Sequence, residues 1–76
     1  MTPGEAYAKG TLVRVRGIMD RTGKPYPFDC GLVLHPETDR VIVVAPLLRY
    51  LRGQTAAHCR SYFARMGWKA TIVRGP

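Results

Sequence analysis

Acidic side chains are scarce in this sequence. Five aspartate and glutamate residues face twelve lysine and arginine residues, which gives a formal net charge of +7 and a pI near 10.1. From position 40 to position 76 there is no acidic residue, against seven basic ones. A net charge of this size is compatible with ordinary solubility, but a solvated surface normally mixes both signs. The imbalance favours nucleic acid or a nucleoprotein as partner, with an acidic protein surface as the alternative.

Long apolar runs are also missing. The longest is "VIVVAPLL" at 41–48, far short of the roughly 20 residues that a membrane-spanning helix needs. The opening "MTPGEAYAKG" lacks the basic and apolar regions of a signal peptide. We therefore expect a cytoplasmic protein with no membrane partner. Its 76 residues predict a single small globular domain over 1–76, with 1–9 as a loose N-terminal arm.

Cysteine and histidine are few, with two of each. Zinc ligands come from pairs held a few residues apart on turns or on one helix face. Cys30 and His35 would point to opposite faces of a strand, and His58 and Cys59 would splay apart on a helix. We expect no metal, no cofactor and free thiols, since nothing indicates an oxidising compartment.

The groups that indicate an enzyme are missing too. All five carboxylates fall in expected loops or in the arm, which argues against paired acid/base catalysis. There is no phosphate-cradling GxxxxGK[ST] loop, and the helical wheel separates Cys59 from the His58 that would have to activate it. We therefore expect a non-enzymatic protein. A ribonuclease that acts through His58 and arginines is the enzymatic alternative.

Alternating residues predict strands in the first half of the chain. Over 11–19, valines alternate with Arg14 and Arg16, which indicates a half-buried strand with a basic outer face. Gly17 interrupts this pattern and suggests a bulge or a bend. Residues 30–35 and 40–45 are expected to pair as an antiparallel hairpin across the turn "PETD". The second of these strands is apolar on both faces, so we expect it to be central or covered.

Helical signals fill most of the second half. "PLLRYLR" at 46–52 predicts a short helix that stops at Gly53, and Thr55 is a typical N-cap for a helix that ends at Gly67. The apolar face of this second helix is expected to dock on the sheet and carries Ala56, Cys59, Phe63 and Met66. "WKATIVR" at 68–74 then predicts a fourth strand.

The predicted element order is β-β-β-α-β, which indicates an α+β fold. We expect a small twisted antiparallel sheet of about four strands with one main C-terminal helix packed on it. The stretches "KGTLVRV", "GLVLHP" and "DRVIVVAP" resemble the meander of an SH3-like barrel, with Gly10, Val13 and Gly31 where such barrels turn and pack. This resemblance covers the first half of the chain and identifies no family.

The stretch "DRTGKPYPFD" at 20–29 is the least regular in the chain. As a loop, it would combine the charges of Arg21 and Lys24 with aromatic rings, as single-stranded nucleic-acid binding requires. Alternatively its rings turn inward; we expect Phe28 to do so and Tyr26 to be the better surface candidate.

Our leading hypothesis is a small basic domain that binds nucleic acid or a nucleoprotein. The alternative is a protein-directed adaptor or inhibitor, of the kind mobile elements and phages encode, that occludes the surface of a host protein; exposed Tyr50, Tyr62 or Trp68 would anchor it. An open edge at the fourth strand would also permit a homodimer. One continuous arginine patch would favour nucleic acid, and an apolar patch ringed by arginines a protein partner. The candidate binding residues are Arg14, Arg16, Arg21, Lys24, Tyr26, Arg49, Arg52, Arg60 and Arg65.

Overall fold

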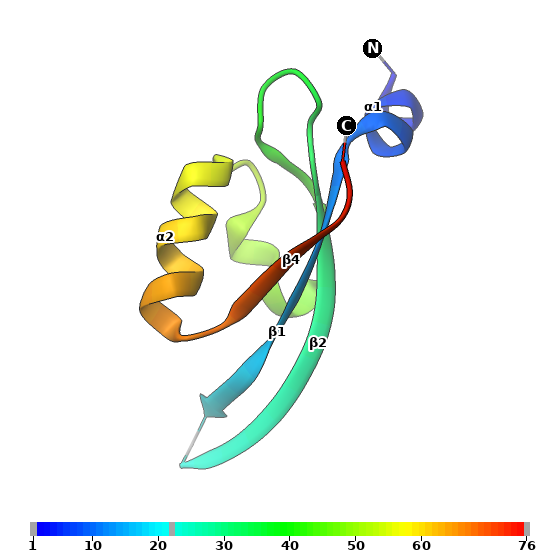
Figure 1. The fold of residues 1–76 in the computed structure, drawn as a ribbon. Coiled ribbons are helices and arrows are strands. Elements are labelled where there is room, and N and C mark those ends of the chain that lie inside the picture. The colour runs from blue at the N-terminus through cyan, green and yellow to red at the C-terminus, as the bar shows by residue number, and fades with distance from the viewer. Residues whose placement is uncertain (1, 22, 76) are drawn as a thin grey trace.

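The computed structural model describes residues 2–21 and 23–75, without the side chains of Pro3 and Arg21. It contains one antiparallel sheet in the order β3-β2-β1-β4, accompanied by helices (Figure 1). The predicted α+β class and the predicted order of the three strands, main helix and last strand are confirmed. In chain order the elements are α1 (Pro3–Lys9), β1 (Thr11–Arg21), β2 (Lys24–Leu34), β3 (Val41–Val44), the 3-10 helix η1 (Pro46–Leu51), α2 (Ala56–Met66) and β4 (Lys69–Arg74).

The sheet is open. β1, β2 and β3 form an antiparallel meander, as the resemblance to SH3-like barrels implies. However, β3 and β4 lie at opposite edges of the sheet and do not pair with each other, so the strands do not close into a barrel.

The β1–β2 hairpin corrects the prediction for residues 20–29. β1 runs to Arg21 and β2 begins at Lys24, so most of the expected loop is paired strand. Pro25 and Pro27 stand opposite Asp20 and Ile18 of β1. They are tolerated because β3 pairs only with residues 32–34, which leaves this part of β2 without a second neighbour. The hairpin projects beyond the helices and gives the molecule a long axis of 43 Å (Figure 1).

The N-terminal stretch also differs from the expected loose arm, because Pro3–Lys9 forms helix α1. Proline suits the first turn of a helix, where its missing N–H has no partner to lose. The Thr2 hydroxyl accepts a hydrogen bond from the Glu5 backbone N–H at 3.2 Å, which caps the helix. The α1 residue Ala6 is buried.

The hydrophobic core lies on one side of the sheet, here called the inner face. Val13 and Val15 of β1 and Leu32 of β2 point to this face and are buried. α2 and η1 lie together on it (Figure 1), and Leu48 and Leu51 of η1 are almost completely buried. Because strand residues alternate, Arg14 and Arg16 belong to the opposite, outer face.

Helix α2 has the predicted bounds and caps. The Thr55 hydroxyl accepts a hydrogen bond from the His58 backbone N–H at 3.2 Å, and Gly67 ends the helix in the left-handed conformation with φ 75°. Cys59 and Phe63 are buried against the sheet as expected. Met66, expected on the same face, is instead 47% exposed because it lies in the last turn, where α2 ends at Gly67.

β3 was expected to be central or covered; it is an edge strand, so it is not central, but it is partly covered. The chain that follows it covers part of its outer edge: the Val41 N–H donates to the Gln54 carbonyl, and the Gly53 N–H donates to the Val41 carbonyl, each at 2.9 Å. Arg40 forms a further bridge to Thr55. Among the described residues, by contrast, the backbone hydrogen bonds of β4 go to β1 alone.

Trp68 fixes the start of β4. Its ring packs directly over Gly17 and edge-on to Phe28, with the two ring centroids 4.8 Å apart. Its indole N–H donates to the Ile18 carbonyl at 3.2 Å, and its backbone N–H donates to the Phe63 carbonyl at 2.9 Å. Gly17 stands in regular register with Phe28, so there is no bulge at this position, the first of the two predicted irregularities; the glycine instead allows close packing by the indole ring.

Candidate functional site

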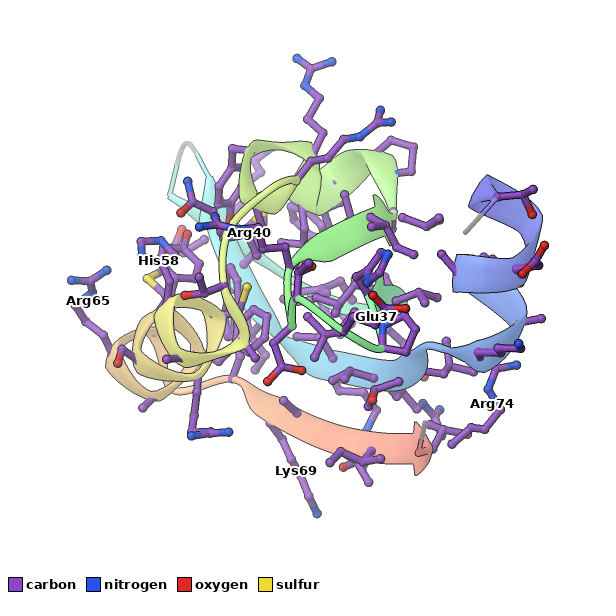
Figure 2. All side chains as sticks on the ribbon, turned by 90° about the horizontal axis from the view of Figure 1, so that it is seen from above. Glu37, Arg40, His58, Arg65, Lys69 and Arg74 are labelled. Carbon is purple, nitrogen blue, oxygen red and sulfur yellow. The ribbon has the colours of Figure 1, made fainter. Side chains whose placement is uncertain are left out.

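The predicted basic residues are divided between the two faces of the sheet. Arg14 and Arg16 lie on the outer face. Arg49 of η1, Arg52 directly after it, and Arg60 and Arg65 of α2 belong to a segment that packs on the inner face. In Figure 2, Arg65 and His58 project from α2 on one side of the molecule, and Lys69 projects from β4 on another. The arginines therefore do not form one continuous patch.

The outer face carries an ion pair between Arg14 and Asp29. The Arg14 Nε donates to Asp29 Oδ1 at 2.8 Å, and the second guanidinium nitrogen contacts Oδ2. This hydrogen bonding lowers the pKa of Asp29 and raises that of Arg14, and the nearby Arg16 lowers the Asp29 pKa further. It is the one ion pair among the side chains that the structure describes.

Arg16 lies between Asp29 of β2 and Lys69 of β4, which are its register partners on either side. Both carboxylate oxygens of Asp29 contact Arg14. Arg16 and Lys69 are therefore two neighbouring positive charges without an ion pair in the described chain. Like charges in directly opposed positions destabilise a sheet. Lys69 was not among the predicted site residues, because its position beside Arg16 depends on a strand order that the sequence does not reveal.

The hairpin places its two aromatic rings as expected, with Tyr26 on the surface and Phe28 turned inward. Tyr26 is 37% exposed, and its hydroxyl donates to the Met19 sulfur at 3.2 Å. Phe28 packs against Trp68 and turns inward as expected. Lys24, Tyr26 and Phe28 are alternate residues of β2, so their side chains lie on the same face of the sheet, opposite to the face that carries Arg14. The side chain of Arg21 lies outside the described ones.

The remaining arginines occupy separate places on the inner side. Arg49 and Arg52 line a shallow groove of about 220 Å³ beside β3. Arg65 lies over the Tyr62 ring, 5.6 Å from its centroid. Tyr62 in turn shares a hydrogen bond with the Tyr50 hydroxyl at 2.7 Å. Arg60 lines a different, larger groove.

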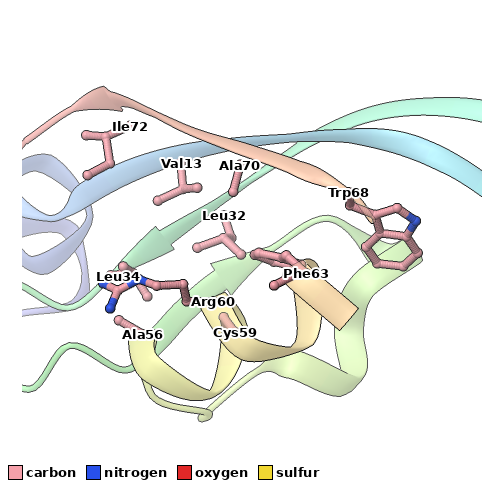
Figure 3. Close-up of a pocket in the computed structure, with 11 residues that line it drawn as sticks. Val13, Leu32, Leu34, Ala56, Cys59, Arg60, Phe63, Trp68, Ala70 and Ile72 are labelled. Carbon is pink, nitrogen blue, oxygen red and sulfur yellow. The ribbon is translucent and has the colours of Figure 1, made fainter. Parts of the chain in front are cut away.

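This larger groove runs between α2 and β4 and has a volume of about 410 Å³ (Figure 3). Phe63 and Cys59 form its α2 side, and Ala70 and Ile72 its β4 side. Trp68 stands at one end, and Arg60 lies at the other, near Ala56 and Leu34 (Figure 3). The full lining is Val13, Leu32, Leu34, Ala56, Cys59, Arg60, Phe63, Ala64, Trp68, Ala70 and Ile72.

β4 is the least covered strand of the sheet. All of its six residues are exposed; Ile72 is 67% exposed and Val73 58%. Of the three aromatic anchors expected for a protein partner, Tyr50 is exposed, Tyr62 is half-buried, and Trp68 is only 7% exposed, so Trp68 is not a surface anchor. Sequence reasoning missed Ile72 and Val73 because an apolar strand is read as buried until its neighbours are known.

Neither a metal-ligand cluster nor an activated thiol is found within residues 2–21 and 23–75. No three histidine, cysteine, aspartate or glutamate side chains there are grouped closely enough to hold a metal ion. Cys30 and Cys59 are free thiols, and burial raises the pKa of both, which disfavours the nucleophilic thiolate.

Comparisons with protein families, with curated proteins and with solved structures found no match to this chain. None of the described helices is long and apolar enough to cross a membrane.

Proposed function

We propose that this chain is a protein-binding domain without catalytic activity, in which the open edge of β4 and the adjoining groove receive an extended segment of a partner protein. A strand added beside β4 would satisfy backbone groups that have no partner in the described chain. Main-chain hydrogen bonds supply affinity in this binding mode, and pockets for alternate side chains supply specificity.

The observation that carries the proposal is an open edge next to an apolar groove. β3, at the other edge of the sheet, is partly covered by residues 53–55, whereas β4 is bare and presents Ile72 and Val73 to solvent. Long exposed apolar edges are a liability, and proteins usually protect them by charge, twist or coverage. A partner strand over β4 would give this exposed apolar surface a use.

Such binding suits an adaptor or an inhibitor. A domain that adds itself to an extended segment of another protein hides that segment from other partners, which is the occlusion expected from the alternative hypothesis. The division of the arginines between two faces favours this hypothesis over a nucleic-acid track, which needs continuous positive charge.

Nuclear magnetic resonance with a probe peptide would test the proposal. A short peptide that alternates valine with threonine is a neutral strand former, and it should shift the amide resonances of β4 and of the groove. Ile72→Thr should weaken binding several-fold, because the Ile72 side chain lies beside the groove. Ile18→Thr is the matched control, since Ile18 is equally exposed, at 64%, but lies on the outer face of β1. Shifts spread evenly over the surface, or equal effects of the two substitutions, would contradict the proposal.

Nucleic-acid binding remains the second candidate, and the basic part of the outer face supports it. Arg14, Arg16 and Lys69 lie together there, and α2 packs on the other face. Titration of fluorescent single- and double-stranded DNA and RNA over a salt series would test it. The expected log–log slope is about −0.9 per phosphate neutralised for duplex DNA. Arg16→Ala/Lys69→Ala should reduce this slope more than Arg60→Ala/Arg65→Ala, and absence of binding at low salt would exclude this candidate.

A further inference from the structure

We infer that the partner segment is an extended strand in which apolar residues alternate with acidic ones. This inference rests on the proposed function and adds the chemistry of the ligand. The apolar residues face the groove between β4 and α2, and the acidic residues face the basic outer side of the sheet.

The two faces of β4 differ in chemistry. Ala70 and Ile72 follow the inner face, since they stand opposite Val15 and Val13, and both line the groove. Lys69 stands on the outer face, opposite Arg16. A strand paired with β4 inherits these faces, because directly opposed residues in a sheet point to the same side. Its side chains therefore meet an apolar groove and a basic surface in alternation.

The outer surface beside β4 carries positive charge that the described chain does not balance. Arg14 contacts both oxygens of Asp29, the nearest carboxylate, and Arg16 and Lys69 form no ion pair. Residues 40–76 contain no aspartate or glutamate that could serve them. A carboxylate on the added strand, placed opposite Lys69, would form the opposite-charge cross-strand pair that stabilises sheets.

Charge also decides among the possible occupants of the edge. A second copy of this chain would bring another β4 with Lys69 and Arg74 and again no acid, at a net charge of +7 for each copy. Nucleic acid would satisfy the cations but leave the groove empty, because it has no alternating apolar side chains. An acidic and apolar strand satisfies both faces at once.

Three short peptides, acetylated and amidated, would test the inference. They alternate valine with aspartate, with threonine or with lysine, and binding is measured by fluorescence anisotropy and by amide shifts at moderate salt. One favourable cross-strand charge pair corresponds to about 1.4- to 5-fold in affinity. We therefore expect the aspartate peptide to bind several-fold more tightly than the threonine peptide, and the lysine peptide to bind weakest. A valine–aspartate peptide with two adjacent central prolines keeps the charge but loses a backbone N–H on the side that faces β4 in either register, and it should lose binding.

Matched variants locate the charge effect. Lys69→Gln should lower the affinity for the aspartate peptide and leave the affinity for the threonine peptide unchanged. Arg52→Gln makes the same change of net charge beside β3, at the opposite edge of the sheet, and should affect neither peptide. Circular dichroism would first verify that both variants keep their helical content. We expect them to do so, because both side chains are exposed and Lys69 forms no ion pair.

The outcomes separate this inference from the proposed function. Equal binding of all three peptides at β4 would keep strand addition and overturn the acidic preference. Failure of every peptide would overturn both. Shifts confined to Arg49, Arg52 or Arg65, or binding by the proline-containing peptide, would show plain charge attraction and overturn the inference. A concentration-dependent dimer in sedimentation, with β4 at its interface, would assign the edge to a second copy. Displacement of the aspartate peptide from β4 by single-stranded DNA that itself binds more tightly would assign it to nucleic acid.

Discussion

The contact between Gly17 and Trp68 makes a quantitative prediction. A Cβ atom at position 17 would lie 2.7 Å from Trp68 Cγ and closer still to Cδ1. The indole has little room to withdraw, because Phe28, Tyr62 and Phe63 surround it and its N–H is bonded to the chain next to Gly17. Gly17→Ala must therefore push the ring out of its place or bend β1.

The expected cost follows from three contributions. Overpacking of a core costs about 1–3 kcal/mol. Weakening of the indole hydrogen bond to Ile18 adds up to about 1 kcal/mol. Replacing a glycine in a strand by alanine stabilises the fold by about 0.5–1 kcal/mol, because glycine loses more conformational entropy on folding. The middle of these ranges gives a net loss of about 2 kcal/mol, and each kcal/mol lowers the Tm by roughly 4–8 °C in a domain of this size.

Thermal unfolding followed by circular dichroism and by fluorescence measures this effect. Trp68 is the only tryptophan of the chain, so a red shift of its emission reports its displacement directly. Gly4→Ala is the control, because no atom lies within 4 Å of its added Cβ and Gly4 lies within α1, where alanine is favoured. If Gly17→Ala unfolded at the same temperature as Gly4→Ala, with unchanged emission, the close-packing argument would be wrong.

Three further predictions concern single contacts. Thr55→Ala removes the cap that accepts from the His58 N–H and should cost about 1 kcal/mol in urea unfolding, whereas Thr55→Ser should retain most of it. The carboxyl group of Asp29 has a lowered pKa because Arg14 is hydrogen-bonded to it; its contribution to stability is present above the unfolded-state pKa and is lost as pH falls through the folded-state pKa. Arg14→Gln should raise the titration midpoint of the Asp29 carboxyl group measured by NMR. An unchanged midpoint would refute the pairing of Arg14 with Asp29 in solution. Burial raises the pKa of Cys59, so its reaction with a thiol reagent at neutral pH should be slow until denaturant is added, and equal rates with and without denaturant would contradict the burial.

Elements with local signals were predictable from sequence. The hairpin of β2 and β3 and helix α2 were predicted because a four-residue turn, an N-cap threonine and a terminal glycine act over a few residues. The bounds of α2 agree with the prediction because Thr55 and Gly67 leave little choice.

The errors arose where the same local sequence is compatible with two structures. Pro25 and Pro27 are typical of a loop, yet they are accommodated in the part of β2 that has one neighbour instead of two. Pro3 and Gly4 also indicate irregular chain, yet proline starts α1 behind the Thr2 cap. Because burial of an apolar strand depends on its neighbours, the edge position of β3 had no signal of its own.

The candidate site was less predictable than the fold. The arginines are visible in the sequence, but which of them share a face depends on strand order and on the side that α2 covers. The groove and the juxtaposition of Arg16 with Lys69 both require β4 to pair with β1. That pairing joins distant parts of the chain and has no local signature.

The same pairing has a consequence for the order of folding. β1, β2 and β3 are joined by short links and can assemble as a local meander, whereas β4 reaches β1 only after the chain has passed through η1 and α2. Closing so long a loop costs entropy before any contact repays it, so distant strand pairs form slowly. β1 therefore keeps a free edge until β4 arrives, and a foreign strand present at that stage competes with β4 itself. The timing of encounter, during or after folding, would then decide whether a partner extends the sheet or replaces its last strand.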